Sequence, residues 1–250
     1  MKLSEIVVFE NYNRQYPRWI RPWYECSTTR YAHPNVTRAI WKASQFASLV
    51  CASFIADARF FFNFTPTETE KPVWPNLQKL VLTTRLFAPE ERDLYAIDSL
   101  FIQASIALEV MPNLRELQLW NGDERVAAVF HYSRRRLGCF ITWKSTWPFQ
   151  LSPSVLASWR RAAGGHCGQE PMIRHDLLDA RQVNSHADAF ILLDILPVAL
   201  RPPSLEQIRV ESMAHRANHE FWSSPVPLRQ NTDWRNQGGP RVGPPAQDRT

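Results

Sequence analysis

The residues best suited to binding a metal are His166, Cys167 and His175, which lie within one short stretch. Imidazole and thiolate groups are common zinc ligands, but a structural zinc site needs four ligands at characteristic spacings. This stretch offers no fourth ligand at such a spacing. We therefore interpret the three as unrelated loop and surface residues, and we expect no metal and no other cofactor.

A second stretch, Ser185-His186-x-Asp188, contains the residue types of a hydrolase triad. Neighbours on a single helical turn cannot form the proton relay, and no Gly-x-Ser-x-Gly elbow occurs in the sequence. Ser185 fits better as the N-cap of a helix, with Asp188 placed favourably for the helix dipole. The sequence also has no glycine-rich phosphate loop. We expect no catalytic residue and a protein that is not an enzyme.

The composition is that of a globular chain that can fill a core, since 44% of its 250 residues are hydrophobic and 21% are charged. No segment approaches the run of about 18 apolar residues that a membrane span needs. The first residues lack the basic and apolar regions of a signal peptide. These patterns predict no membrane association and a cytoplasmic or nuclear location. Four distant cysteines in such a chain are expected to be isolated, mostly buried thiols: Cys26, Cys51, Cys139 and Cys167.

The formal charge of +5 is mildly basic, and the only dense run of it is Arg134-Arg135-Arg136. Nucleic-acid-binding proteins usually concentrate their charge in a patch or along one helix. We interpret the run as part of a solvated hairpin turn over residues 133–137, so that nucleic acid is not the expected partner. A basic nucleic-acid-binding module that uses Arg134–Arg136 stays as the alternative function.

One short pattern, Leu-x-x-Leu-x-Leu with aliphatic substitutes, recurs along the chain and predicts the elements of the fold. Its good copies begin at Leu3, Leu77, Leu114 and Leu205, and a looser copy at Phe46 lies in a helical context. Three copies follow a proline, which marks the change from helix to strand. The copies are uneven and lie farther apart than the repeats of about 20 to 29 residues in regular leucine-rich-repeat proteins.

Within each copy the last three positions alternate, so that Leu80 and Leu82 would face the core and Lys79 the opposite way. In a leucine-rich repeat such strands form a parallel sheet, and the outward positions form a ribbon that binds partners. The predicted partner-binding residues follow from this phase: Lys79, Val81, Thr83, Glu116, Gln118, Trp120, Gln207, Arg209 and Glu211.

Apolar residues at helical spacing predict helices over residues 34–49, 94–111, 153–163 and 186–198. Two β-prone runs, 126–132 and 138–143, predict an inserted hairpin. Residues 164–168 are expected to form a loop, and Asn121-Gly122 a turn that ends a strand. The Pro- and Gly-rich residues 222–250 are expected to be a disordered tail. The predicted fold is therefore α/β: an irregular leucine-rich-repeat-like solenoid of parallel strands and covering helices over residues 1–221.

A series of short motifs, in order, carries a resemblance to a known group of proteins. They include the segments Ala52–Ala58, Trp74–Leu77, Met111–Leu114, Leu119–Gly122, Ala128–Tyr132, Ile141–Trp147, Ser185–Ala189 and Arg201–Leu205. With these, the chain resembles fungal F-box-like proteins with degenerate leucine-rich repeats, which are catalogued as a domain of unknown function. The matching stretches span roughly residues 1–211.

The resemblance implies a protein–protein interaction scaffold. Members with an N-terminal F-box would dock through it on the Skp-type adaptor of a cullin ubiquitin ligase and hold a substrate with their repeats. Here the first residues already match a repeat strand, and no F-box helix precedes them. The expected function is thus the substrate-recognition part of an F-box-type receptor that lacks its F-box. Its partner is a protein not identified by the sequence, and it meets a Skp-type adaptor only if an F-box lies upstream.

Overall fold

The computed structural model describes residues 4–9, 32–63, 72–195 and 197–223. The chain divides into two compact units, residues 1–215 and residues 216–250. Nearly all of the described residues belong to the first unit, and the architecture below is that of this unit. Cys26, Leu3 and residues 224–250 of the tail predicted over 222–250 lie outside the described part of the chain, whereas residues 222 and 223 are helical and not disordered as predicted.

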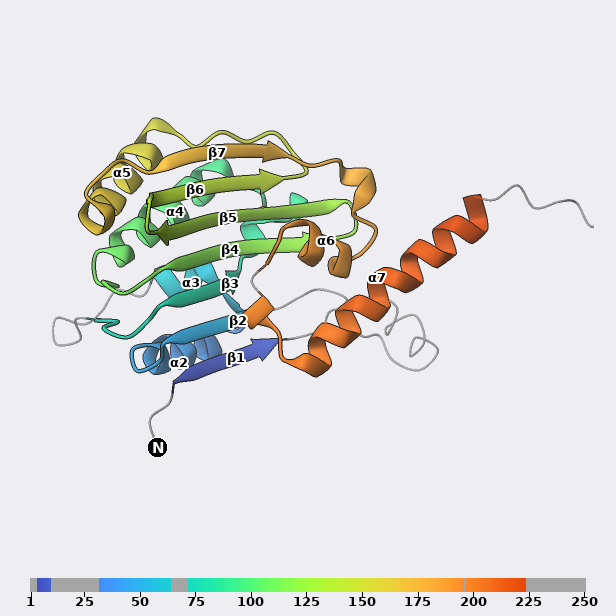
Figure 1. Cartoon of the computed structure of the whole chain (residues 1–250), viewed down its shortest axis with the longest axis horizontal. Coiled ribbons are helices and arrows are strands. Elements are labelled where there is room, and N and C mark those ends of the chain that lie inside the picture. The colour runs from blue at the N-terminus through green and yellow to red at the C-terminus, as the bar shows by residue number, and fades with distance from the viewer. Residues whose placement is uncertain (1–3, 10–31, 64–71, 196, 224–250) are drawn as a thin grey trace, which may run out of the picture. The chain divides into compact units, whose positions relative to one another are not determined.

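A seven-stranded open sheet forms the centre of the first unit, with its strands side by side in chain order (Figure 1). The strands are β1 (Glu5–Phe9), β2 (Leu49–Asp57), β3 (Lys79–Thr83), β4 (Glu116–Asp123), β5 (Val126–Arg135), β6 (Gly138–Ser145) and β7 (Met172–Leu177). Strands β1 to β4 are parallel, β4 to β6 pair antiparallel, and β7 is parallel to β6. The fold is therefore mixed α/β, with a parallel part joined to a hairpin.

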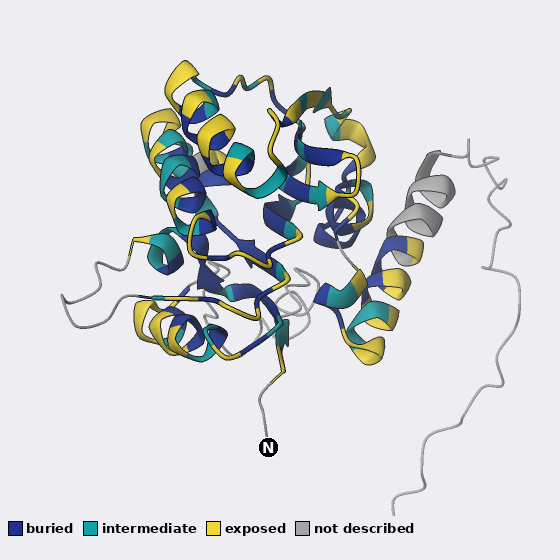
Figure 2. Cartoon of the chain, turned by 60° about the vertical axis from the view of Figure 1, so that its left-hand side comes forward, coloured by how far each residue is buried: buried dark blue, intermediate teal, exposed yellow. Residues whose placement is uncertain are grey.

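Helices cover both faces of the sheet. One face packs against α2 (Pro34–Ser44), α3 (Ala58–Phe62), α4 (Leu94–Leu108) and α5 (Pro153–Cys167), which lie behind the sheet in Figure 1. The other face packs against α6 (His186–Leu192), the 3-10 turn η4 (Pro197–Ala199) and the beginning of α7 (Pro202–Ser223). Because both faces are covered, the strands are largely buried, and the exposed residues lie mainly on outer helix faces and loops (Figure 2).

The recurring pattern places aliphatic side chains at the same register in four neighbouring strands. Position by position, Ile6 pairs with Val50, Val50 with Leu80, and Leu80 with Leu117. Two residues later the same holds for Val8, Ala52, Leu82 and Leu119. The residues at these positions in β2 to β4 are buried beneath α2, α3 and α4. The strand copies at Leu3, Leu77 and Leu114 were therefore predicted in the right phase.

Two copies of the pattern were predicted wrongly. The copy at Phe46 runs into the strand β2: Ala47, Val50 and Ala52 pack on the face covered by α2 to α5, whereas the pattern positions Leu49 and Cys51 are buried on the other face. Alanine and valine fill these positions, so their small size hid the true phase. The copy at Leu205 is part of α7, not a strand. Leu-x-x-Ile spacing also fits one face of a helix, and proline at the first helical positions starts α7 where it was expected to precede a strand.

The helices and the hairpin were otherwise placed correctly, with shifted ends. Helix α2 ends at Ser44 because β2 begins at Leu49, and α6 ends at Leu192. Helix α5 continues through the expected loop to Cys167, where Gly168 closes it with a positive φ of 69°. Strand β4 runs through Asn121 and Gly122, and the turn follows at Glu124 and Arg125. Arg125 adopts a positive φ of 59° there.

Candidate functional site

The predicted partner-binding residues do not form an exposed ribbon. Val81, Gln118 and Trp120 are 0% exposed, while Thr83 and Glu211 are also buried. Lys79 and Glu116 are half-buried, and Gln207 and Arg209 are exposed but belong to the helix α7. The sequence thus identified the outward phase of β3 and β4 correctly but missed the layer that covers it.

That layer is built by α6, η4 and the first turns of α7. Phe190 packs edge-on against Trp120, with ring centroids 5.6 Å apart, and the Gln118 side-chain amide donates to the backbone oxygen of Asp194 at 3.2 Å. Gly122 allows the closest approach, since a Cβ there would lie 2.4 Å from the Cβ of Ala189. The second face of the parallel sheet is therefore an interior.

The triad-like residues serve to build this layer. Ser185 accepts from the Asp188 backbone N–H at 3.1 Å and caps α6, as the sequence predicted. The buried Asp188 carboxylate accepts from the Asn184 N–H at 3.2 Å and from the Ser212 hydroxyl at 2.6 Å, which ties α7 to α6. The His186 ring stacks on Trp120, with centroids 6.2 Å apart, so it lies inside the aromatic cluster of this face.

The carboxyl ends of parallel strands are where open α/β sheets usually bind ligands, and here they hold the carboxylate of Asp57. One of its oxygens accepts from the Thr84 hydroxyl at 3.1 Å and from the Arg59 N–H at 2.9 Å. The other accepts from the Arg85 N–H at 3.0 Å and from the Arg59 guanidinium at 3.1 Å. Glu91 pairs with both arginines. With each oxygen accepting two bonds, Asp57 joins the end of β2 to the end of β3.

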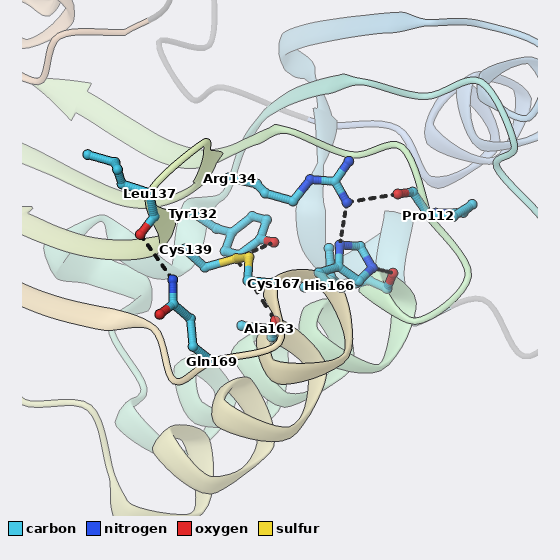
Figure 3. Close-up of a disulfide and its surroundings, with 10 residues drawn as sticks. Pro112, Tyr132, Arg134, Leu137, Cys139, Ala163, His166, Cys167 and Gln169 are labelled. Carbon is cyan, nitrogen blue, oxygen red and sulfur yellow. Dashed lines mark hydrogen bonds between the residues drawn. A yellow bond between two sulfur atoms is a disulfide. The ribbon is translucent and has the colours of Figure 1, made fainter.

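Two of the residues considered above as metal ligands, His166 and Cys167, have other partners in the structure. The Nε2 atom of His166 lies 3.0 Å from the Leu108 backbone oxygen, and Cys167 forms a disulfide with Cys139 (Figure 3). The expectation of isolated thiols is therefore wrong for this pair, because the fold brings the end of α5 onto the beginning of β6. Cys51 is a free buried thiol, and burial raises its pKa to about 12. Among the described residues no group of three or more His, Cys, Asp or Glu could hold a metal ion.

The opposite edge of the sheet, at the amino ends of β2, β3 and β4, carries a row of exposed apolar side chains. Because β5 runs antiparallel to β4, the β5–β6 turn and the beginning of β7 also lie at this edge. The row consists of Phe46, Val73, Val110, Leu137 and Met172. Phe46 is 72% exposed and Leu137 is 80% exposed. We call these five residues, with Arg115, Arg134, Arg135 and Arg136, the amino-edge surface; it lies at the left of Figure 1.

Arg134 is the arginine of this surface that backbone contacts hold in place. Arg134 donates from its guanidinium to the Pro112 oxygen at 2.9 Å, and its N–H donates to the Arg115 oxygen at 2.7 Å. The same guanidinium lies 3.5 Å from Nδ1 of His166 (Figure 3). Burial and this neighbouring positive charge lower the pKa of His166, which keeps the imidazole neutral at neutral pH. Arg135 and Arg136 are exposed beside Leu137.

A family model matches residues 1–199, which is most of the chain and nearly all of the sheet and its helices. The chain belongs to DUF6546, a family of unknown function. No curated protein and no solved structure matches the chain. The DUF6546 region ends within η4, so it includes α6 and most of the layer that buries Trp120. Within the part of the chain that the structure describes, no helix is long and apolar enough to cross a bilayer.

The amino-edge surface was not predicted from the sequence, although some of its apolar residues occupy related positions in the sequence. Val73 and Val110 precede the Pro-Asn-Leu segments, and Leu137 follows the arginine run. Each is a single apolar residue in a connecting segment, which is unremarkable by itself. Only the strand order reveals that these segments lie along one edge.

Proposed function

We propose that this DUF6546 chain is a protein-binding scaffold and that its partner docks on the amino-edge surface. The observation that supports the proposal is the row of five exposed apolar residues, four from connecting segments and Met172 from the beginning of β7, together with the arginines at its β4–β6 end. Exposed apolar groups that gather in one region often mark a protein interaction site. Arginine beside apolar residues is also enriched at interfaces.

The partner that this surface fits is a protein segment with apolar side chains and flanking carboxylates. Arg115, Arg135 and Arg136 are exposed, and their planar guanidinium groups can bind carboxylates through two parallel hydrogen bonds. Glu116 beside them already pairs with His131 at 2.6 Å, so it competes little for these arginines.

The βα units of β1 to β4 support a degenerate leucine-rich-repeat relationship, because each strand adds the same two aliphatic positions to one face. On this basis the scaffold serves as the recognition part of an F-box-type ubiquitin-ligase receptor, with the adaptor contact supplied by an F-box. Deletion of the gene should then lengthen the half-life of the captured partner. An unchanged half-life would remove the ligase role and leave the scaffold.

The test compares two charge-introducing variants of the full chain in cells by proximity labelling and quantitative mass spectrometry. Phe46→Asp with Leu137→Asp changes the amino-edge surface. Tyr95→Asp is the matched control, since Tyr95 is 84% exposed at the beginning of α4, at the other edge. We expect the first variant to lose specific partners that the control retains. Identical partner sets for both variants would overturn the proposal.

The nucleic-acid alternative predicts a different outcome. If Arg134–Arg136 bind nucleic acid, the purified chain will shift DNA or RNA in a salt-dependent manner. Replacing the three arginines with alanine would then abolish the shift, whereas Phe46→Asp with Leu137→Asp would leave it nearly unchanged.

A further inference from the structure

We propose that Cys139 and Cys167 form a reversible redox modification site, and that a low-molecular-weight disulfide or thiol sets its state. In the oxidised state the bond fixes the last turn of α5 to the β5–β6 hairpin. In the reduced state that turn opens. The chemistry of the pair goes beyond the proposed scaffold function and does not depend on which partner the amino-edge surface binds.

The two cysteines are positioned for exchange with a small molecule. Their Cα atoms are 6.1 Å apart, within the usual range of about 4.4 to 6.8 Å for a disulfide. Cys139 is 1% exposed on β6, whereas Cys167 is partly exposed at the end of α5. Exchange requires attack on an accessible sulfur. We therefore expect the small molecule to react first with Cys167, and the buried Cys139 to react second and displace it.

The surroundings of Cys139 suit both oxidation states (Figure 3). The hydroxyl of Tyr132 lies 3.3 Å from its sulfur and donates to it in the disulfide form. The Ala163 oxygen lies 3.9 Å from the same sulfur and can accept from the thiol after reduction. Neither state therefore leaves the buried sulfur without a suitable neighbour, which favours reversibility.

The last turn of α5 contains two consecutive glycines that packing does not require. A Cβ at Gly164 or Gly165 would meet nothing within 4 Å. Glycine weakens a helix relative to alanine because it loses more backbone freedom when it is ordered. The turn that carries His166 and Cys167 is consequently weak by itself. It is held at its end by the disulfide, by the contact of His166 with Leu108, and by the Gly168 N–H bond to the Gly164 oxygen.

The exchange is balanced in two steps. The Cys167 thiolate attacks one sulfur of a small disulfide; a mixed disulfide forms and one small thiolate leaves. The Cys139 thiolate then attacks the Cys167 sulfur, and the second small thiolate leaves. The two protons of the protein thiols end on the two small thiols, so one small disulfide is reduced for each protein disulfide formed. Excess thiol reverses both steps.

Opening of the turn would also change the amino-edge surface. His166 lies against the guanidinium of Arg134, whose backbone is paired with Arg115. Release of His166 removes one neighbour from the Arg134 side chain at the end of β5, while the β5–β6 pairing remains. The oxidised form therefore holds the Arg134 guanidinium more firmly than the reduced form.

The experiment uses the full chain with Cys26→Ser and Cys51→Ser, so that only the pair remains. The protein is equilibrated with mixtures of reduced and oxidised glutathione, free thiols are trapped with a maleimide, and intact mass is measured. We expect the two thiols to disappear together as oxidised glutathione increases and to return with excess reduced glutathione. Two thiols that stay free at every ratio, or that end as two separate glutathione adducts, would overturn the proposal.

Amide hydrogen exchange then tests the turn itself. Reduction should speed exchange of residues 164–168 by about tenfold or more, while the β4–β5 pairing stays protected. The matched variant Gly164→Ala with Gly165→Ala strengthens the helix without a clash, so reduction should affect its exchange much less. No acceleration in the glycine-containing protein would show that the disulfide does not hold the turn, and equal acceleration in both proteins would overturn the role of the two glycines. In both proteins the reduced state is produced by chemical reduction, so the test does not depend on whether a variant such as Cys139→Ser folds.

Discussion

Replacing Gly122 with alanine tests directly whether α6 packs onto β4 and makes the second face of the sheet an interior. The added Cβ would lie 2.4 Å from the Cβ of Ala189, whereas carbon atoms in contact lie about 3.5 to 4.0 Å apart. The helix must therefore retreat by roughly 1 Å or more. Forcing extra atoms into a packed core costs about 1 to 3 kcal/mol. Alanine in a strand recovers roughly 0.5 to 1 kcal/mol of this relative to glycine, so a net loss of about 0 to 2.5 kcal/mol is expected.

A double-mutant cycle separates the clash from other effects of the substitution. Ala189→Gly removes the opposing methyl group and by itself costs about 1 kcal/mol of helix stability. If Gly122 and Ala189 meet as described, the double variant will be about 0.5 to 1 kcal/mol more stable than Ala189→Gly alone, because the strand gain remains and the clash is gone. The coupling energy, measured by urea denaturation, should then be about 1 to 3 kcal/mol in favour of the double variant. Additive effects of the two substitutions would refute the packing of α6 on this face.

Two further predictions concern the polar groups of the site. Asp57→Ala removes the acceptor of four hydrogen bonds and should reduce the free energy of unfolding by about 1 to 3 kcal/mol. The control Asp176→Ala breaks an ion pair with Arg174, whose side chain is 75% exposed, and should change stability by less than about 1 kcal/mol; equal losses would contradict the role of Asp57. The pKa of His166 in the folded protein lies below its usual value, so as the pH falls the unfolded chain is protonated at this residue before the folded one. The free energy of unfolding should therefore decrease as the pH is lowered from the usual histidine pKa near 6.5 to the pKa of His166 in the folded protein. A His166→Gln variant should lose that part of the pH dependence, as measured by denaturation between pH 5 and pH 8, and an unchanged profile would show that His166 does not cause it.

Much of the fold could be predicted from the sequence because local patterns set it. Strands β3 and β4, the β5–β6 hairpin and the cores of α2, α4, α5 and α6 each carry a clear apolar period and a capping or turn residue. The copy at Leu205 shows the limit of such patterns. Leu205 and Ile208 are three residues apart, which suits either a strand motif or a helix face, and the prolines at its start are compatible with both.

The functional surface could not be predicted because it depends on contacts between distant segments. The alternation in β3 and β4 correctly separates two faces, but alternation does not say whether the outward face meets solvent or another helix. The predicted ribbon at Val81, Gln118 and Trp120 is apolar enough to be an interior, and α6 covers it from more than 60 residues away along the chain. The Cys139–Cys167 pair was hidden for the same reason, since nothing local brings the end of α5 to β6.

Covering both faces of a sheet has a consequence for where a partner can bind. In a leucine-rich repeat one face is covered by helices and the other stays open, but here the open face is used to pack α6 and the beginning of α7. Side chains on both faces of the strands are therefore buried in one of two hydrophobic cores. Side chains of the connecting segments are left to contact a partner protein. At the carboxyl ends, the polar groups of Asp57 and its neighbours form hydrogen bonds and ion pairs with one another. At the amino ends Phe46, Leu137 and the arginines face solvent. The strand order thus places several connecting segments side by side along the edge where we expect the partner.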